Sequence, residues 1–129
     1  KLKAAGFNTE LFFAGDLDNG LQLKQLTRML NSNVDILVIA SIDGFSLVDT
    51  LKPAQDKKIP IISYDRLIMN TDAPTYYASV DSEMIGELQG QYIIDQLQPG
   101  SGSVKQIEIF TGSPDDNNAR IFYEGAMKK

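Results

Sequence analysis

The sequence predicts an α/β fold built on an open, doubly wound parallel sheet. Two observations carry this prediction. Short apolar runs alternate along the chain with segments whose apolar residues recur at helical spacing. The short runs are apolar at nearly every position, which is typical of strands buried on both faces of a parallel sheet. We therefore expect helices to cover both faces of the sheet.

The predicted elements follow from these patterns in chain order. Five strands are expected, at residues 9–14, 34–40, 59–64, 75–80 and 104–110. The helices are marked by apolar residues at helical spacing: Leu23, Leu26 and Leu30; Leu47, Leu51 and Ala54; Ile85, Leu88 and Tyr92; and the segment 120–127. Pro53 stands inside the second helix pattern and should kink that helix or end it early. The stretch PGSG at residues 99–102 should stop the third helix.

The composition excludes several classes of function. The 129 residues suit one domain, or parts of two, and 43% hydrophobic residues are enough for a core. The net charge of −5 argues against a nucleic-acid partner, which requires a basic face. Without any His or Cys, the chain cannot use thiol catalysis, a histidine base, disulfides or the common zinc sites.

The sequence also gives information about membrane-spanning and targeting segments and about a natural start. No apolar run is long enough to span a bilayer, and no signal peptide is visible. The chain opens with KLKAAGF, which has the form of a helix end followed by a glycine stop. We therefore expect an incomplete fragment whose front is missing.

Each predicted strand ends in polar residues that include an Asp. These ends hold Asp16, Asp43, the pair Asp65–Arg66, Asp81, and the stretch GSPDDNNA at residues 112–119. Ligands of open parallel sheets bind outside the carboxyl ends of the strands. Local roles compete with binding, because Asp is a common helix N-cap. We expect caps at Asp43, at Asp81 or Ser82, within the group Asp16, Asp18 and Asn19, and at one residue of GSPDDNNA.

The mixture of Asp, Arg and Asn favours a polyhydroxylated neutral ligand. Carboxylates accept hydrogen bonds from hydroxyls, Arg donates through a rigid fork, and Asn does both. A phosphate site would favour glycine-rich loops and basic residues, and neither GxGxxG nor GxxxxGK is present. A metal held by Asp115 and Asp116, and acid catalysis by a carboxylate pair, are open but weaker alternatives.

Four segments resemble a known family: NVDILVIASIDG, IPIISYDRLI, YYASVDSEMIGELQG and IEIFTGSPDDNNARIFYEGAM. They are similar to the type I periplasmic sugar-binding proteins, closest to the branch that binds D-xylose and related monosaccharides for ABC transporters. The motifs YDR and SPxDNNA are specific to this branch when they occur together. The resemblance covers essentially the whole chain.

This resemblance implies two Rossmann-like lobes joined by a hinge, with a monosaccharide enclosed between them. Residues 1–80 would belong to the first lobe, whose first strand is missing between the segments 9–14 and 34–40, and residues 81–129 would begin the second lobe. The family's ligand-binding positions correspond to Asp65 and Arg66 in the first lobe and to Asp116 and Asn118 in the second. Asn117 is expected to support the turn or the helix start.

The resemblance also implies a protein that binds without catalysis, cofactor or metal. Its partners would be a monosaccharide and an ABC-transporter permease, with a chemoreceptor or sensor kinase as a further partner, and no nucleic acid. Its location would be periplasmic, or extracellular and lipid-anchored at the cell surface. Two alternatives share this fold: the sugar-sensing ectodomain of a sensor kinase and the effector domain of a sugar-responsive repressor.

Overall fold

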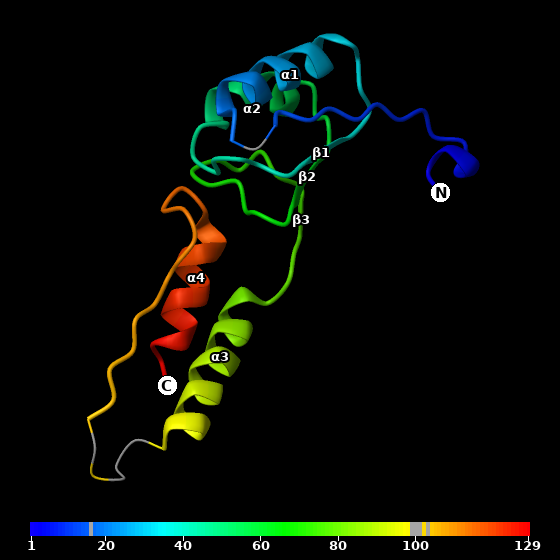
Figure 1. Ribbon diagram of the computed structural model, residues 1–129. Coiled ribbons are helices and arrows are strands. Elements are labelled where there is room, and N and C mark those ends of the chain that lie inside the picture. The colour runs from blue at the N-terminus through cyan, green and yellow to red at the C-terminus, as the bar shows by residue number, and fades with distance from the viewer. Residues whose placement is uncertain (16, 99–101, 103) are drawn as a thin grey trace.

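The computed structural model describes residues 1–15, 17–98, 102 and 104–129 (Figure 1). A three-stranded parallel sheet has the order β1-β2-β3, with β1 at Leu37–Ile39, β2 at Ile61–Tyr64 and β3 at Tyr76–Ala78. Helix α1 spans Asn19–Asn31 and α2 spans Val48–Asp56. A short 3-10 helix, η1, at Lys3–Ala5 precedes them. The predicted alternation of helices and parallel strands is confirmed in this part of the chain.

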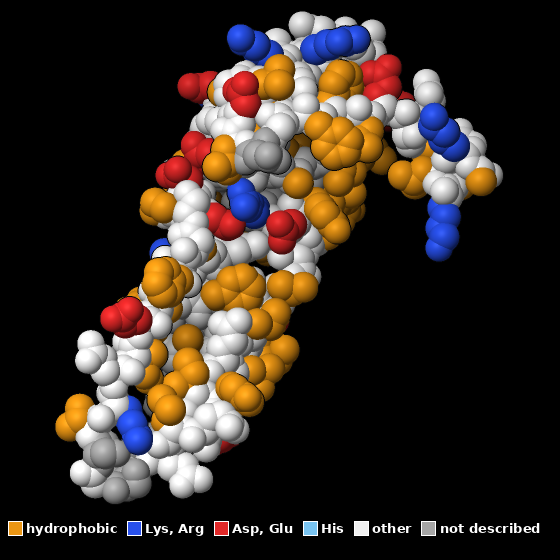
Figure 2. Space-filling view, viewed as in Figure 1, with side chains coloured by type: hydrophobic (Ala, Val, Ile, Leu, Met, Phe, Trp, Pro, Cys, Tyr) orange, Lys and Arg blue, Asp and Glu red, His pale blue; other side chains and the backbone are white. Residues whose placement is uncertain are grey.

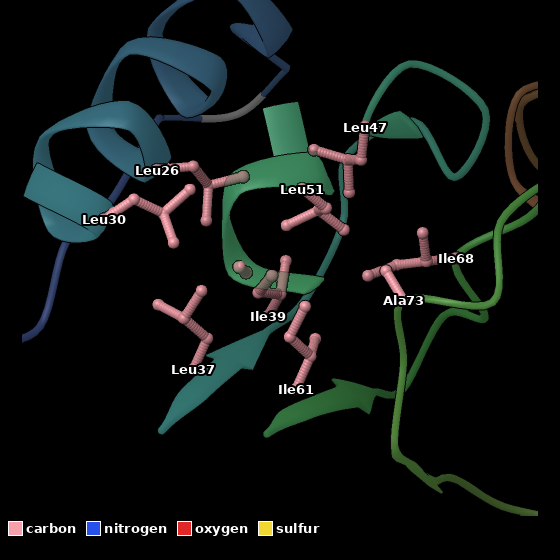
Figure 3. Close-up of a cluster of buried hydrophobic side chains, with 10 residues drawn as sticks. Leu26, Leu30, Leu37, Ile39, Leu47, Leu51, Ile61, Ile68 and Ala73 are labelled. Atoms are coloured by element: carbon pink, nitrogen blue, oxygen red, sulfur yellow. The ribbon is translucent and has the colours of Figure 1, made fainter. Parts of the chain in front are cut away.

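One face of this sheet carries the hydrophobic core. Both α1 and α2 lie against that face, and Figure 3 shows their leucines meeting the alternate residues of β1 and β2. The core residues are Leu26, Leu30, Leu37, Ile39, Leu47, Leu51, Ala54, Ile61, Ile68 and Ala73. Because strand side chains alternate between the two faces, Leu37 and Ile39 are buried while Val38, between them, is 61% exposed.

The opposite face of the sheet differs from the prediction. Val38 and Tyr76, which are in register with Ile62 on this face, are exposed, and no helix of the described residues covers them. The reason lies in the connections. Helix α2 links two adjacent parallel strands through one crossover, and α1, which precedes β1, packs beside α2 on the same side. Apolar residues on both strand faces indicate a two-sided sheet but do not say which elements cover each side.

Two predicted strands are not strands in the structure. Residues 9–14 and 104–110 have no regular secondary structure, although the second segment runs as an extended trace alongside helix α4 (Figure 1). A strand exists only through hydrogen bonds to a neighbouring strand, and neither segment has one among the described residues. Most of their apolar side chains are exposed instead, as at Phe13 and Phe110, whereas Ala14 is buried.

Beyond β3 the chain forms a pair of helices, α3 at Ser82–Leu97 and α4 at Asn117–Ala126, which pack against each other (Figure 1). Glycine permits their close approach. A Cβ atom on Gly86 would overlap with the carbonyl oxygen of Phe122, and one on Gly90 with that of Ala126. The expected lobe boundary at residues 80 and 81 falls where the chain leaves the sheet, and it stays a prediction.

The helix starts test the predicted caps. Asp18 accepts from the Leu21 amide at 2.8 Å, and Asp81 accepts from the Met84 amide at 2.9 Å, so both caps are confirmed. Asp16 and, apart from Gly102, the PGSG stop lie outside the described residues.

The prediction for Asp43 is wrong, and Pro53 does not end its helix early. Asp43 accepts from the Phe45 amide at 2.7 Å in a turn, and α2 begins only after Leu47. The turn formed by residues 43–46 delays the helix. Pro53 lies inside α2, which continues to Asp56 because the proline removes only one hydrogen bond of the helix. No helix of the described residues combines the length and apolar character needed to cross a membrane.

Candidate functional site

Asp65 and Arg66 directly follow β2 in a tightly held turn. Asp65 adopts the left-handed conformation, with φ of 64°, and its amide donates to the Ala78 carbonyl of β3 at 2.9 Å. The hydroxyl of Ser63, which is fully buried, donates to the Arg66 carbonyl at 2.8 Å and accepts from the Ile68 amide at 3.0 Å. The main chain on both sides of Arg66 is therefore anchored.

GSPDDNNA forms the turn into α4. Asp116 is the N-cap, and its Oδ1 accepts from the Asn118 amide at 2.9 Å. The predicted helix cap within GSPDDNNA is therefore confirmed at Asp116, whose Oδ2 remains available for another partner. Asn117 begins the helix, where its Oδ1 accepts from Arg120 at 2.8 Å, so it supports the helix start as expected.

Two contacts join these segments, which lie about fifty residues apart in the sequence. Arg66 Nη2 forms an ion pair with Asp116 Oδ2 at 2.9 Å, and these side chains are 30% and 17% exposed. Asn118 Nδ2 donates to the carbonyl oxygen of Asp65 at 3.1 Å and lies 3.3 Å from Asp65 Oδ1. All four residues expected at the site are thus brought together at the carboxyl end of β2.

The guanidinium of Arg66 has a further partner. Its Nη1 donates to the Ile42 carbonyl at 2.9 Å, beyond the end of β1. Gln22 holds that segment from α1, donating to the Ala40 carbonyl and accepting from the Ile42 amide, both at 2.9 Å. Gln22 and Ser63 were not predicted from the sequence. The sequence feature that could have identified them is a polar residue at a position where the helix or strand pattern places apolar residues toward the core.

Asn118 retains hydrogen-bonding capacity. Its Nδ2 faces two oxygens of Asp65, which fixes the orientation of the amide. Its Oδ1 is buried and has no hydrogen-bond partner among the described residues. An unsatisfied buried acceptor costs about 1–3 kcal/mol, so a donor placed beside it would be bound favourably.

The acidic side chains of the described residues are dispersed rather than clustered. No group of three or more acidic side chains gathers within the ranges 1–15, 17–98, 102 and 104–129. Asp115 is exposed, and Asp116 is engaged by Arg66 and by the helix start. The arrangement instead presents a fixed cation, two carboxylates and an amide, which are groups that recognise hydroxyls.

Comparison with known proteins identifies the family. The periplasmic binding protein domain family matches residues 1–129, the whole chain. The chain belongs to this family.

Two curated relatives of this periplasmic binding protein domain are sugar-binding proteins. The chain is 46% identical over 129 residues to the multiple sugar-binding periplasmic protein SbpA of Azospirillum brasilense, covering 98% of the chain and 36% of that protein. It is 35% identical over 127 residues to the D-xylose-binding periplasmic protein of Haemophilus influenzae, again covering 98% and 36%. The chain therefore spans about a third of the length of these relatives.

A solved structure supports the same assignment. The ABC-transporter solute-binding protein of Clostridium phytofermentans, with β-D-glucose bound, superimposes with a TM-score of 0.89 at 47% identity. The match covers 98% of this chain and 39% of that one. The predicted resemblance and the predicted type I periplasmic binding protein fold are both confirmed.

Proposed function

We propose that this chain is part of the sugar-binding component of an ABC importer and that it contributes half of a clamp around a monosaccharide. The observation that carries the proposal is the meeting of Asp65 and Arg66 with Asp116 and Asn118 at the carboxyl end of the sheet. The relatives support it, because they bind sugars and match across this segment. A sugar presents both donor and acceptor hydroxyls, which these four groups complement.

Binding would exchange contacts rather than create them all anew. The Arg66–Asp116 and Asp65–Asn118 contacts occupy the groups that a sugar would use. A ligand that separates the two segments would insert hydroxyls between them and satisfy the buried Oδ1 of Asn118. Hinge motion between two lobes, which open to admit a ligand and close around it, is a general way to make such an exchange.

The proposal includes a role without catalysis. Both carboxylates of the cluster are engaged by donors, and the matched relatives are described as binding proteins. We place the protein in the periplasm, or anchored by lipid outside the cell, with an importer permease as its partner. The sensor-kinase and repressor alternatives are not better supported by these relatives.

The test is sugar binding by the mature protein that contains this chain. A thermal-shift screen should include D-glucose, D-xylose, L-arabinose, D-galactose and D-fructose, with titration calorimetry for those that raise the melting temperature. We expect at least one monosaccharide to bind with micromolar or tighter affinity. Arg66→Ala should then weaken binding by about 2–6 kcal/mol, because at least two ligand or protein acceptors lose their donor at about 1–3 kcal/mol each.

Asp18→Ala is the control for this experiment. Asp18 caps α1, and within the described part of the chain no hydrogen bond or ion pair joins it to the four site residues. Its replacement should leave the affinity unchanged. If no sugar binds, the proposed function is wrong, and if Arg66→Ala binds as tightly as the parent, Arg66 does not belong to the site.

A further inference from the structure

We propose that Tyr77 and Ser79 are positioning residues of the ligand site, which hold the main-chain carbonyl oxygen of Asp65 where Asn118 docks. This inference deepens the proposed function and rests on it where affinity is concerned. Neither residue belongs to the YDR or SPxDNNA motif, and neither is adjacent to a site residue in sequence.

Three side chains converge on one oxygen atom. Ser79 Oγ donates to the Asp65 carbonyl at 2.7 Å, Tyr77 Oη at 3.1 Å and Asn118 Nδ2 at 3.1 Å. A carbonyl oxygen has two lone pairs, so these three donors fill both of them and at least two donors share one. The two hydroxyls come from β3 and the residue just after it, while the amide comes from α4.

The Asp65 peptide needs such support. A non-glycine residue with φ of 64° is in a sparsely populated conformation, which persists only where its surroundings hold it. The Asp65 amide is tied to Ala78 at 2.9 Å, and the carbonyl is tied to Tyr77 and Ser79. The strand β3 and the residue after it therefore hold both polar ends of this residue.

This conformation places the site. Asp65 lies between β2 and Arg66, so its backbone angle sets the direction in which the Arg66 side chain leaves the sheet. Arg66 then meets Asp116 while the Asp65 carbonyl meets Asn118. If the carbonyl moved, both contacts with α4 would have to change together.

The position of Ser79 in the chain adds a consequence. Ser79 lies between the end of β3 at Ala78 and Asp81, the N-cap of α3. The chain leaves the sheet here (Figure 1), and the Ser79 hydroxyl is hydrogen-bonded to the Asp65 carbonyl oxygen of the site. A change in the path of the segment 79–81 would therefore reach the site through one hydrogen bond.

The first test is sugar affinity in the mature protein that contains this chain, with the monosaccharide from the panel above that binds most tightly. Ser79→Ala and Tyr77→Phe should each weaken binding about three- to ten-fold, the scale of one neutral hydrogen bond, because the released Asp65 peptide no longer aims the Asp65 and Arg66 side chains at the ligand. Ser79→Thr keeps the hydroxyl and should restore binding to within about three-fold of the parent.

Tyr76→Phe is the matched control. Tyr76 neighbours Tyr77 on β3, is also exposed, and its hydroxyl makes no hydrogen bond within the part of the chain that the structure describes. The affinity of this variant should equal that of the parent. Unchanged affinity in both Ser79→Ala and Tyr77→Phe would overturn the inference.

The second test needs no ligand. Urea unfolding of Ser79→Ala, Asn118→Ala and the double variant forms a cycle that reports whether the two residues act through one another. We expect the combined loss of stability to be smaller than the sum of the single losses, because Asn118 loses its placed partner once Ser79 is gone. Additive losses would overturn the inference, because the two residues would then act independently. A combined loss larger than the sum would also overturn it, because the two donors would then merely replace one another at the Asp65 oxygen.

The two tests separate the two proposals. A parent protein that binds no sugar refutes the proposed function, while the unfolding cycle still decides the role of Ser79. A parent protein that binds a sugar, with variants that bind equally well, refutes the positioning role alone.

Discussion

Replacing Arg66 by Ala should lower the free energy of unfolding by about 2 kcal/mol. The change removes the ion pair with Asp116 at 2.9 Å and the hydrogen bond to Ile42 at 2.9 Å. A hydrogen bond to a charged group contributes about 1.5–3 kcal/mol when it is shielded, and an exposed ion pair about 0–1 kcal/mol. With side chains 30% and 17% exposed, the Arg66–Asp116 pair lies between these limits, and the Ile42 bond adds to it.

Arg120→Ala provides the comparison. Arg120 also pairs with a carboxylate at 2.7 Å, that of Glu124, but both side chains are more than half exposed and lie on one helix. Arg120 also donates to Asn117 Oδ1 at 2.8 Å, so the loss of both contacts should cost about 0.5–1 kcal/mol. Both variants are measured by urea unfolding, together with hydrogen exchange at the Asn118 amide, which should exchange faster only in Arg66→Ala. Equal losses in the two variants would refute the conclusion that Arg66 ties the sheet to α4.

Three further predictions concern packing, capping and association. Gly86→Ala should lower the free energy of unfolding by about 2 kcal/mol in urea, because its methyl group would overlap with α4, and an unchanged stability would contradict the close contact. Gly20→Ala is the comparison: there is room for its methyl group, so it should stabilise α1 by up to about 1 kcal/mol. Asp18→Ala should cost about 1–2 kcal/mol, and a smaller loss in Asp18→Asn, which keeps a capping oxygen, would identify the cap as the cause. The 129-residue chain expressed alone should self-associate in sedimentation experiments, because the sheet face with Val38 and Tyr76 is exposed. Figure 2 also shows hydrophobic side chains on the surface along α3 and beside the strands. A stable monomer that binds a sugar would contradict this prediction.

Local features of this protein are determined by the sequence itself. The caps at Asp18, Asp81 and Asp116 were predictable to within a few neighbouring residues, because a cap requires only a short polar side chain and the amides two or three residues further along. The cores of β1 and β2 were predictable because a buried parallel strand must be apolar. The motifs that contain Arg66 and Asn118 together indicate the family, and each can be recognised without the fold because it is a short contiguous stretch of residues.

Relations between distant segments were decided by the tertiary structure. Residues 9–14 and 104–110 have strand-like sequences, but strand formation requires a neighbour, which the pattern of one segment cannot supply. The helix after Asp43 starts late because a turn competes for that carboxylate.

The pairing of Arg66 with Asp116 depends on where α4 comes to lie, and the segments are about fifty residues apart. The convergence of Tyr77, Ser79 and Asn118 on the Asp65 oxygen likewise depends on the left-handed turn after β2 and on the register of β3. Residue type sets which atoms can donate or accept, whereas only the packing of the elements determines which of them meet.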